Sequence, residues 1–147
     1  MQKFRVCILL IILLAAAATA AGQETSPEAA THYETARQAL AAQELDKALD
    51  AVNAGIGLAP QSFQLYFLRG HIHLARKDYG QAEADFTKAI SLKPDLPELY
   101  TMRARAFQGL NRPVEALKDL DLALSLDPNY GDALFSRAYV YVQLGRE

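Results

Sequence analysis

The residues that could carry chemistry are few in this 147-residue chain, which has three histidines and one cysteine. No segment matches a serine-nucleophile turn, a zinc-binding His-Glu motif or a glycine-rich phosphate loop. His71 and His73 are two positions apart, which on a helix points their side chains to nearly opposite sides, so one metal ion cannot take both. The sequence therefore predicts no enzyme, no catalytic residue, no metal site and no cofactor.

Two sets of mainly aromatic and basic residues recur at a fixed interval of 34 positions. The first set is Tyr33, Phe67, Thr101 and Phe135, and the second is Arg37, His71, Arg105 and Tyr139. The second set follows the first by four residues, so the two would stack on one helix face as a ladder. Aromatic and arginine side chains are frequent interface hot spots. The ladder predicts a groove for an extended or helical peptide with apolar anchors and acidic groups. The alternative is that Phe67 and Phe135 only pack between helices.

Arginine and aspartate recur at the same interval, at Arg69, Arg103 and Arg137 and at Asp85 and Asp119. Near the start of the pattern both types are missing together, replaced by Thr35 and Ala51. Joint presence and joint absence indicate side chains that meet between packed helices. We therefore predict two structural ion pairs, Arg69–Asp85 and Arg103–Asp119, which can fix helix register even where their net stabilisation is small.

The elements that must position these residues follow from the period itself. Each period closes with a similar phrase that ends in proline, at Pro60, Pro94 and Pro128. Two stretches with helical spacing of apolar residues precede each of the later prolines, for example 62–76 and 79–92. The residue before a proline disfavours the helical conformation, so each proline ends a second helix. Together with the abundance of Ala and Leu, this pattern predicts an all-α protein.

A 34-residue helix–turn–helix unit of this kind resembles the tetratricopeptide repeat. The matching positions include Tyr66, Tyr100, Gly70, Ala104, Phe107, Ala82, Ala116, Phe86, Leu120, Ala89 and Ala123, with the closing prolines. The first unit departs most, with His32, Ala36 and Ala39 at the aromatic–small–aromatic positions. The resemblance implies a right-handed superhelical solenoid whose concave face is lined by the first helix of each repeat.

We place the repeat units at 29–62, 63–96, 97–130 and, as a partial unit, 131–147. The last unit contains only its first helix, which would leave Ala138, Tyr141 and Val142 without a helix to cover them. Repeat arrays need a terminal cap with a polar outer face. The interpretation that we favour is a piece of a longer protein. The alternative is that this end docks onto something else.

Residues 1–21 have the pattern of a signal peptide, followed by a short linker at 22–28. Lys3 and Arg5 precede an apolar stretch, and Ala18-Thr19-Ala20 offers a cleavage site. An uncleaved membrane anchor is the alternative, although the apolar stretch is shorter than the roughly 20 residues of a spanning helix. Cys7 precedes the apolar core, which argues against a lipid anchor. We expect an exported protein, in the bacterial periplasm or outside the cell.

The charge pattern excludes two kinds of partner. The formal net charge is −2, and the charges are interspersed rather than clustered. No basic stripe for nucleic acid or an anionic membrane is present. The mature chain would also have no cysteine, and hence no disulfide.

The sequence thus predicts a non-enzymatic scaffold that binds a partner peptide in a concave groove. One alternative is an N-terminal helper region of a larger envelope assembly factor or enzyme, and another is self-association into a homo-oligomer through the last helix. Some members of the family that it resembles hold a terminal carboxylate with a Lys/Asn/Arg clamp. The corresponding positions here hold Tyr33, Arg37, Gln64, Leu68 and Met102. We therefore expect no such two-carboxylate clamp.

Overall fold

The computed structural model describes residues 26–145, which form seven α-helices and no strand. The helices are α2 (Pro27–Ala41), α3 (Leu45–Leu58), α4 (Phe63–Arg76), α5 (Tyr79–Leu92), α6 (Pro97–Gly109), α7 (Pro113–Leu126) and α8 (Gly131–Gln143). The predicted all-α fold is therefore confirmed. The predicted signal peptide lies outside the described residues. Within them, no helix is long and apolar enough to cross a membrane.

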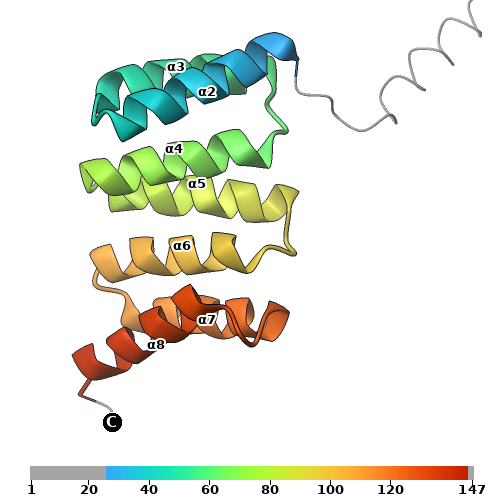
Figure 1. Cartoon of the computed structure of the whole chain (residues 1–147). Helices are drawn as coiled ribbons and strands as arrows, with labels where there is room; N and C mark the ends of the chain where they lie inside the picture. Colours follow the sequence, from blue (N-terminus) through green and yellow to red (C-terminus); the bar gives the residue numbers. More distant parts are fainter. Residues whose placement is uncertain (1–25, 146–147) are drawn as a thin grey trace, which may run out of the picture.

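The helices stack in layers of two (Figure 1), with α2 against α3, α4 against α5 and α6 against α7, while α8 forms the last layer. The first helix of each layer contacts the first helix of the next layer: α2 contacts α4, α4 contacts α6, and α6 contacts α8. In the described part of the chain, no second helix contacts another second helix. The first helices therefore lie closer together and line the inner side of the stack.

The predicted linker at 22–28 is wrong at its C-terminal end, because Pro27 and Glu28 already belong to α2. Ser26 caps this helix: its Oγ accepts a hydrogen bond from the backbone N–H of Ala29 at 3.1 Å. Proline at the first helical position loses no hydrogen bond, because that N–H has no partner inside a helix. By contrast, α4, α6 and α8 begin at the first residue of the predicted units.

The turn inside each helix pair repeats in atomic detail. Gln43, Lys77 and Asn111 adopt left-handed backbone conformations, with φ of 62°, 65° and 57°. The N–H of the following residue donates to a carbonyl five residues earlier, as from Asp78 to His73 at 2.9 Å. This is the Schellman ending of a helix, which usually has glycine at the left-handed position. The absence of glycine hid the motif from sequence analysis.

The turn between pairs is held by tyrosine. The hydroxyl of Tyr66 donates to the carbonyl of Pro60 at 3.1 Å, and that of Tyr100 donates to Pro94 at 2.9 Å. The recurring tyrosine therefore ties the closing proline to the helix that follows it.

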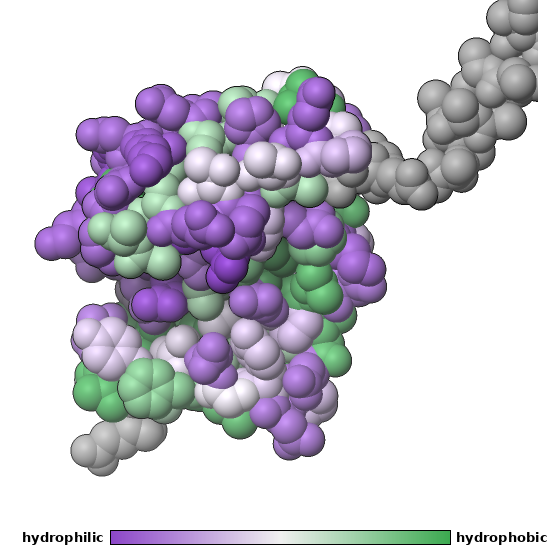
Figure 2. All heavy atoms as spheres, turned by 45° about the horizontal axis from the view of Figure 1, so that its top comes forward, coloured by the Kyte–Doolittle hydropathy of each residue, from purple (hydrophilic) through white to green (hydrophobic). Residues whose placement is uncertain are grey.

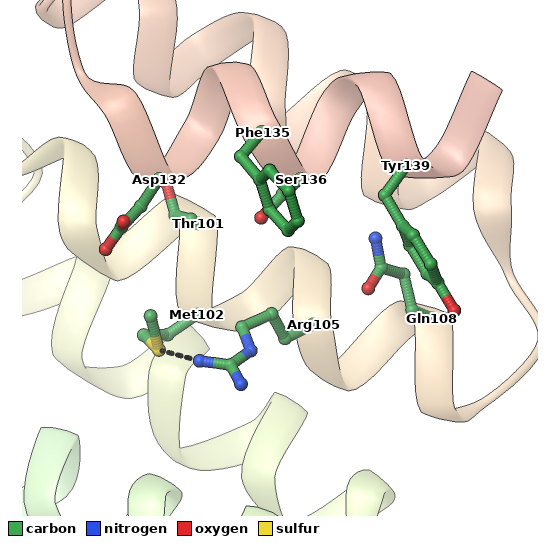
Figure 3. A pocket seen from close by; sticks show the side chains of 8 residues that line it. All are labelled: Thr101, Met102, Arg105, Gln108, Asp132, Phe135, Ser136 and Tyr139. Carbon is green, nitrogen blue, oxygen red and sulfur yellow. Dashed lines mark hydrogen bonds between the residues drawn. The ribbon is translucent and has the colours of Figure 1, made fainter. Parts of the chain in front are cut away.

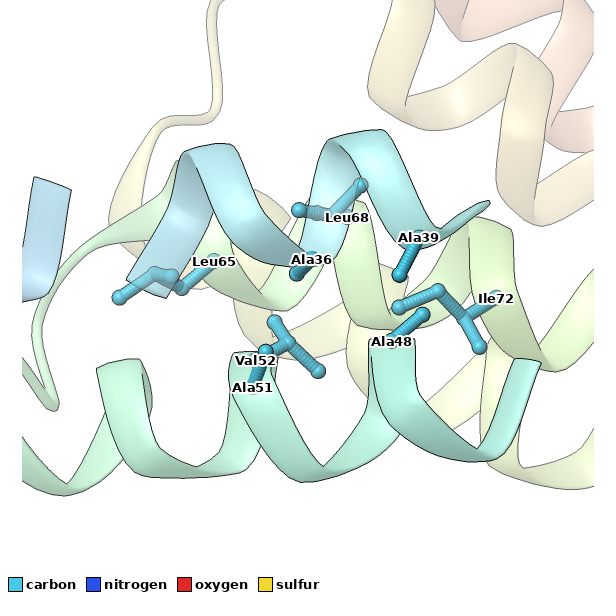
Figure 4. Packing of buried hydrophobic residues seen from close by; sticks show 8 residues of the cluster. All are labelled: Ala36, Ala39, Ala48, Ala51, Val52, Leu65, Leu68 and Ile72. Carbon is cyan, nitrogen blue, oxygen red and sulfur yellow. The ribbon is translucent and has the colours of Figure 1, made fainter. Parts of the chain in front are cut away.

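The core is built from small residues on facing helices. Figure 4 shows the first cluster, made of Ala36, Ala39, Ala48, Ala51, Val52, Leu65, Leu68 and Ile72. Alanines from α2 and α3 let these two helices approach closely, and larger side chains of α4 fill the space beside them. Gly70 likewise allows close packing between α4 and α5, because an added Cβ would lie 2.6 Å from the ring of Phe86.

The structure brings together both pairs of residues predicted to form structural ion pairs. Arg69 Nε and Nη2 donate to the two carboxylate oxygens of Asp85 at 2.9 and 2.7 Å. Arg103 contacts Asp119 in the same way, at 2.7 and 2.8 Å. The side chains of Asp85 and Asp119 are only 7% and 5% exposed. Each pair joins the first and second helices of one repeat.

We predict that these pairs stabilise the fold. Asp119→Ala leaves the half-buried guanidinium of Arg103 without its carboxylate, so the free energy of unfolding should fall by about 3 kcal/mol. Asp121→Ala is the matched control, because the pair that Asp121 forms with Arg137 is solvent-exposed and should be worth only about 0–1 kcal/mol. Urea denaturation of both variants measures the difference. Equal losses in the two would contradict a structural role for the buried pair.

Candidate functional site

All eight residues of the predicted ladder lie on the first helices, α2, α4, α6 and α8. Their environments differ along the array, however, so the ladder is not one uniform surface.

At the α2 end, the basic member of the ladder is already paired. Arg37 Nη2 and Nε donate to the carboxylate of Glu34 at 2.7 and 2.9 Å. These hydrogen bonds, with a further one from Gln38, lower the pKa of Glu34 to about 2. Tyr33 is half-buried and borders a pocket of about 250 Å³ between α2 and α4. An acidic ligand would have to compete with Glu34 for Arg37.

The middle of the ladder is an aromatic cluster. The rings of Phe67 and His71 meet edge to face with centroids 4.5 Å apart, and both lie within 6.0 Å of the Phe86 ring. Burial lowers the pKa of His71, and the positive charge of Arg105 lowers it further. Both effects favour the uncharged imidazole, so at neutral pH His71 adds an aromatic ring rather than a positive charge to the ladder.

The α8 end contains a pocket of about 420 Å³ between α6 and α8 (Figure 3). α6 contributes Thr101, Met102, Arg105 and Gln108, and α8 contributes Asp132, Phe135, Ser136 and Tyr139. Phe135 and Tyr139 point from α8 toward the α6 residues and remain 75% and 51% exposed. Four predicted ladder residues thus meet at one pocket.

Thr101 is placed differently from the prediction. Its side chain is fully buried, and its hydroxyl donates to the carbonyl of Pro97 at 3.0 Å. α8 packs over this part of α6, so Thr101 belongs to the floor of the pocket and cannot serve as an exposed contact.

Arg105 is the exposed cation of the pocket. Its Nη1 lies 3.8 Å from the sulfur of Met102 (Figure 3), and no carboxylate pairs with it in the region 26–145. Unlike Arg37, it can offer its guanidinium to a bound carboxylate without displacing an internal partner. Planar guanidinium groups favour bidentate hydrogen bonding to carboxylates.

Four lining residues were not assigned to the groove from the sequence: Met102, Gln108, Asp132 and Ser136. Helical spacing could have found them, because each lies three or four residues from a ladder member. Gln108 is the most informative of them. Its side-chain nitrogen is buried and has no hydrogen-bond partner among residues 26–145. An unsatisfied buried donor costs about 1–3 kcal/mol.

Part of the hydrophobic surface lies at the α8 end of the array (Figure 2). The exposed large apolar side chains of α8 are Leu134, Phe135, Tyr139, Tyr141 and Val142. Contiguous apolar surface on a soluble protein commonly marks an interaction site. This end of the molecule is therefore the strongest candidate for contact with a partner.

His71 and His73 lie in different surroundings. Across the described residues, no group of three or more His, Cys, Asp or Glu side chains could hold an ion. His71 lies in the aromatic cluster, whereas His73 Nε2 is 3.7 Å from the carboxylate of Asp85. The two histidines do not share a site.

Comparison with known proteins identifies the repeat. Residues 63–96 and 101–147 each match a tetratricopeptide-repeat family model. The chain is 41% identical over 73 residues to the DnaJ homolog subfamily C member 7 homolog of Dictyostelium discoideum, covering 47% of this chain and 14% of that protein. It is 34% identical over 118 residues to the mouse mitochondrial import receptor subunit TOM70, covering 77% of this chain and 17% of the receptor. The chain thus spans only a small part of these relatives.

Solved structures show the same architecture. The first repeat domain of Spaghetti (RPAP3), bound to the HSP90 peptide SRMEEVD, is similar with a TM-score of 0.78 and 25% identity, over 82% of this chain and 95% of that one. The Arabidopsis OM64 domain is similar with a TM-score of 0.72 and 26% identity, over 76% of this chain and 93% of that one.

The half-buried His71 generates a pH prediction. Because the pKa of His71 is lowered in the folded state, the unfolded chain binds more protons just below the ordinary value of 6.5. Stability should therefore fall as the pH drops below about 6.5, and His71→Phe should reduce this loss.

Arg105→Gln provides the control, because it removes the second cause of the shift and leaves burial in place. NMR titration should find the pKa of His71 below 6.5 and should find it higher in the variant. A His71 pKa at or above 6.5 in the native chain, or one unchanged by Arg105→Gln, would contradict this account.

Proposed function

Because this chain is built from tetratricopeptide repeats, we propose that it is a non-enzymatic interaction module whose concave face binds a peptide segment of another protein. The observation that carries the proposal is the α6–α8 pocket. There the exposed Arg105, free of any carboxylate among the described residues, lies beside the exposed rings of Phe135 and Tyr139. A cation next to two aromatic anchors suits a short peptide rather than a small apolar ligand.

The groups in the pocket specify the ligand. Arg105 favours a carboxylate, either a side chain or a chain terminus. Phe135 and Tyr139 favour an apolar or aromatic side chain packed between them. Asp132 on the opposite rim disfavours a second acidic group there, so the ligand's negative charge should lie on the α6 side.

A relative supports this class of ligand. The peptide bound by the RPAP3 domain, SRMEEVD, is acidic and contains apolar residues. In this chain, Tyr33, Gln64 and Met102 stand among the positions where the clamp of other family members would need Lys or Asn. We therefore propose that acidic peptides are held here through Arg105 at the α6–α8 end instead of a two-carboxylate clamp.

We also propose that the module is exported, on the strength of the basic start and apolar stretch within residues 1–21. Expression of the full chain in a bacterium should yield a protein in the periplasmic fraction whose N-terminal sequence begins near Ala21. Recovery of an intact N-terminus in the cytoplasm would contradict export.

The peptide site is tested by charge reversal. A peptide carrying an acidic and an aromatic residue, selected against the native chain from a displayed library, is titrated against variants by fluorescence anisotropy. Arg105→Glu should weaken binding about tenfold or more, and Phe135→Ala should weaken it by a similar factor.

Lys118→Glu is the matched control, because it makes the same charge change at an exposed site on the second helix α7. It should alter the affinity by less than about twofold, since distant exposed charges are screened. If Lys118→Glu weakens binding as much as Arg105→Glu does, recognition depends on overall charge and the groove assignment is wrong.

A further inference from the structure

The pocket of about 250 Å³ between α2 and α4 lies two layers away from the α6–α8 pocket. It is lined by Ala29, Ala30, Tyr33 and Glu34 of α2 and by Ser62, Gln64 and Leu65 at the start of α4. Tyr33 has the same phase in the 34-residue period as Phe135, which lines the α6–α8 pocket. Both pockets therefore belong to the inner side of the stack, and we call this one the α2–α4 pocket.

Small residues line the α2–α4 pocket at positions where the later layers have large ones. Ala29 has the phase of Phe63. Ser62, the residue before α4, has the phase of Leu96 and Tyr130, which precede α6 and α8. Phe63, Leu96 and Tyr130 are each half-buried, and Tyr130 packs against the apolar core beside it. The first junction between layers thus lacks side-chain volume that the later junctions have.

The polar groups of the pocket wall already bind partners within the chain. Both carboxylate oxygens of Glu34 accept hydrogen bonds from Arg37, and one accepts a further bond from Gln38. The hydroxyl of Ser62 donates to the side-chain oxygen of Gln64 at 3.0 Å. A charged ligand group would have to replace one of these bonds or lose its own hydration. The rest of the wall is alanine, leucine and a tyrosine ring, so the pocket favours an apolar group.

The size of the pocket narrows the choice of apolar group. An apolar cavity of about 150 Å³ is enough for a benzene ring. A pocket of about 250 Å³ therefore accommodates a phenylalanine or leucine side chain. The ring of Tyr33 adds a preference for an aromatic side chain, because ring pairs contribute beyond the area that they bury.

We propose that the α2–α4 pocket is a second anchor site, which takes one phenylalanine or leucine side chain of the peptide held in the concave groove. This inference rests on the proposed function and adds an apolar determinant to the acidic one at Arg105. Residues 22–25, which precede α2, are Gly, Gln, Glu and Thr and offer no large apolar side chain for the pocket.

The separation of the two pockets sets the spacing of the two determinants. The pockets are two steps apart along the stack of first helices (Figure 1). Axes of packed helices lie roughly 8–10 Å apart, so two steps span roughly 16–20 Å. An extended peptide advances about 3.3 Å per residue. The ligand should therefore carry its apolar residue about five or six residues from its acidic one.

The α2–α4 pocket is tested first without a peptide, by NMR titration of the full chain with N-acetyl-phenylalanine amide up to its solubility limit. The signals of Tyr33 and Leu65 should shift in the native chain. They should not shift in Ala30→Phe, which fills the pocket from an exposed position of α2. Thr31→Phe is the matched control, because it adds the same ring at an exposed position of α2 outside the pocket lining. Unchanged Tyr33 and Leu65 signals in the native chain would overturn the inference, whatever the groove binds.

Peptides of fixed sequence then test the spacing. Each has a Glu-Tyr pair and, about six residues away along a Gly-Ser linker, either phenylalanine or alanine. Both chain orders are titrated against the full chain by fluorescence anisotropy. In the order that fits the groove, the phenylalanine peptide should bind about tenfold more tightly than the alanine peptide. This advantage should disappear when the linker is shortened to about two residues.

Two filling variants should also remove the advantage of phenylalanine. One is Ala30→Phe, and the other is Ser62→Leu, which introduces the residue type found at Leu96. Ser62→Leu should be tolerated, because neither Ser62 nor Leu96 makes a side-chain cap bond to its helix.

Arg105→Glu separates this inference from the groove proposal. It should weaken binding of the phenylalanine and alanine peptides by the same factor, because Arg105 does not line the α2–α4 pocket. An advantage of phenylalanine that persists while Arg105→Glu has no effect would contradict the groove assignment alone. Equal binding of the two peptides at every spacing would overturn this inference alone. It would also be overturned if sedimentation showed a dimer that Ala30→Phe dissociates, since the occupant would then be a second copy of the chain.

Discussion

Each guanidinium of Arg69 and Arg103 joins three helices, and the geometry of the array depends on that bridge. Arg69 lies on α4, binds the carboxylate of Asp85 on α5 and reaches back to Asn53 on α3. A planar group with five donors in fixed directions can satisfy all of these contacts in only one arrangement. The net stabilisation of such a pair is modest, because desolvation offsets much of the attraction. Its greater effect is to set how one repeat is placed on the next.

This placement brings the first helices together on the inner side of the stack but does not make that side uniform. Near α2, Glu34 already occupies the guanidinium of Arg37. In the middle, the ring of His71 is half-buried between Phe67 and Phe86 and uncharged. Only toward α8 do a free cation and exposed aromatic rings occur side by side among the described residues. Recognition of charge should therefore concentrate at one end of the groove.

The two faces of α8 differ in kind. One face has side chains that converge with those of α6 on a pocket, which is the proposed site for an acidic peptide. The other presents Leu134, Arg137, Ala138 and Tyr141. α6 and α7 both contact α8, whereas no later helix lies within residues 26–145, so several apolar side chains of α8 remain exposed.

The sequence by itself determined the period, the helical class and the register of charged residues. The pairing of Arg69 with Asp85 could be inferred because both types vanish together in the first unit, and that reasoning needs no coordinates. Tertiary structure alone decided which residues of one face are accessible. Thr101 and Phe135 share a phase, yet the first is buried and the second is exposed, since α8 packs over α6 and no later layer within residues 26–145 packs over α8. Periodicity specifies the direction of a side chain from its helix axis. Burial depends on what the neighbouring helix places in that direction, and so does the charge state of His71.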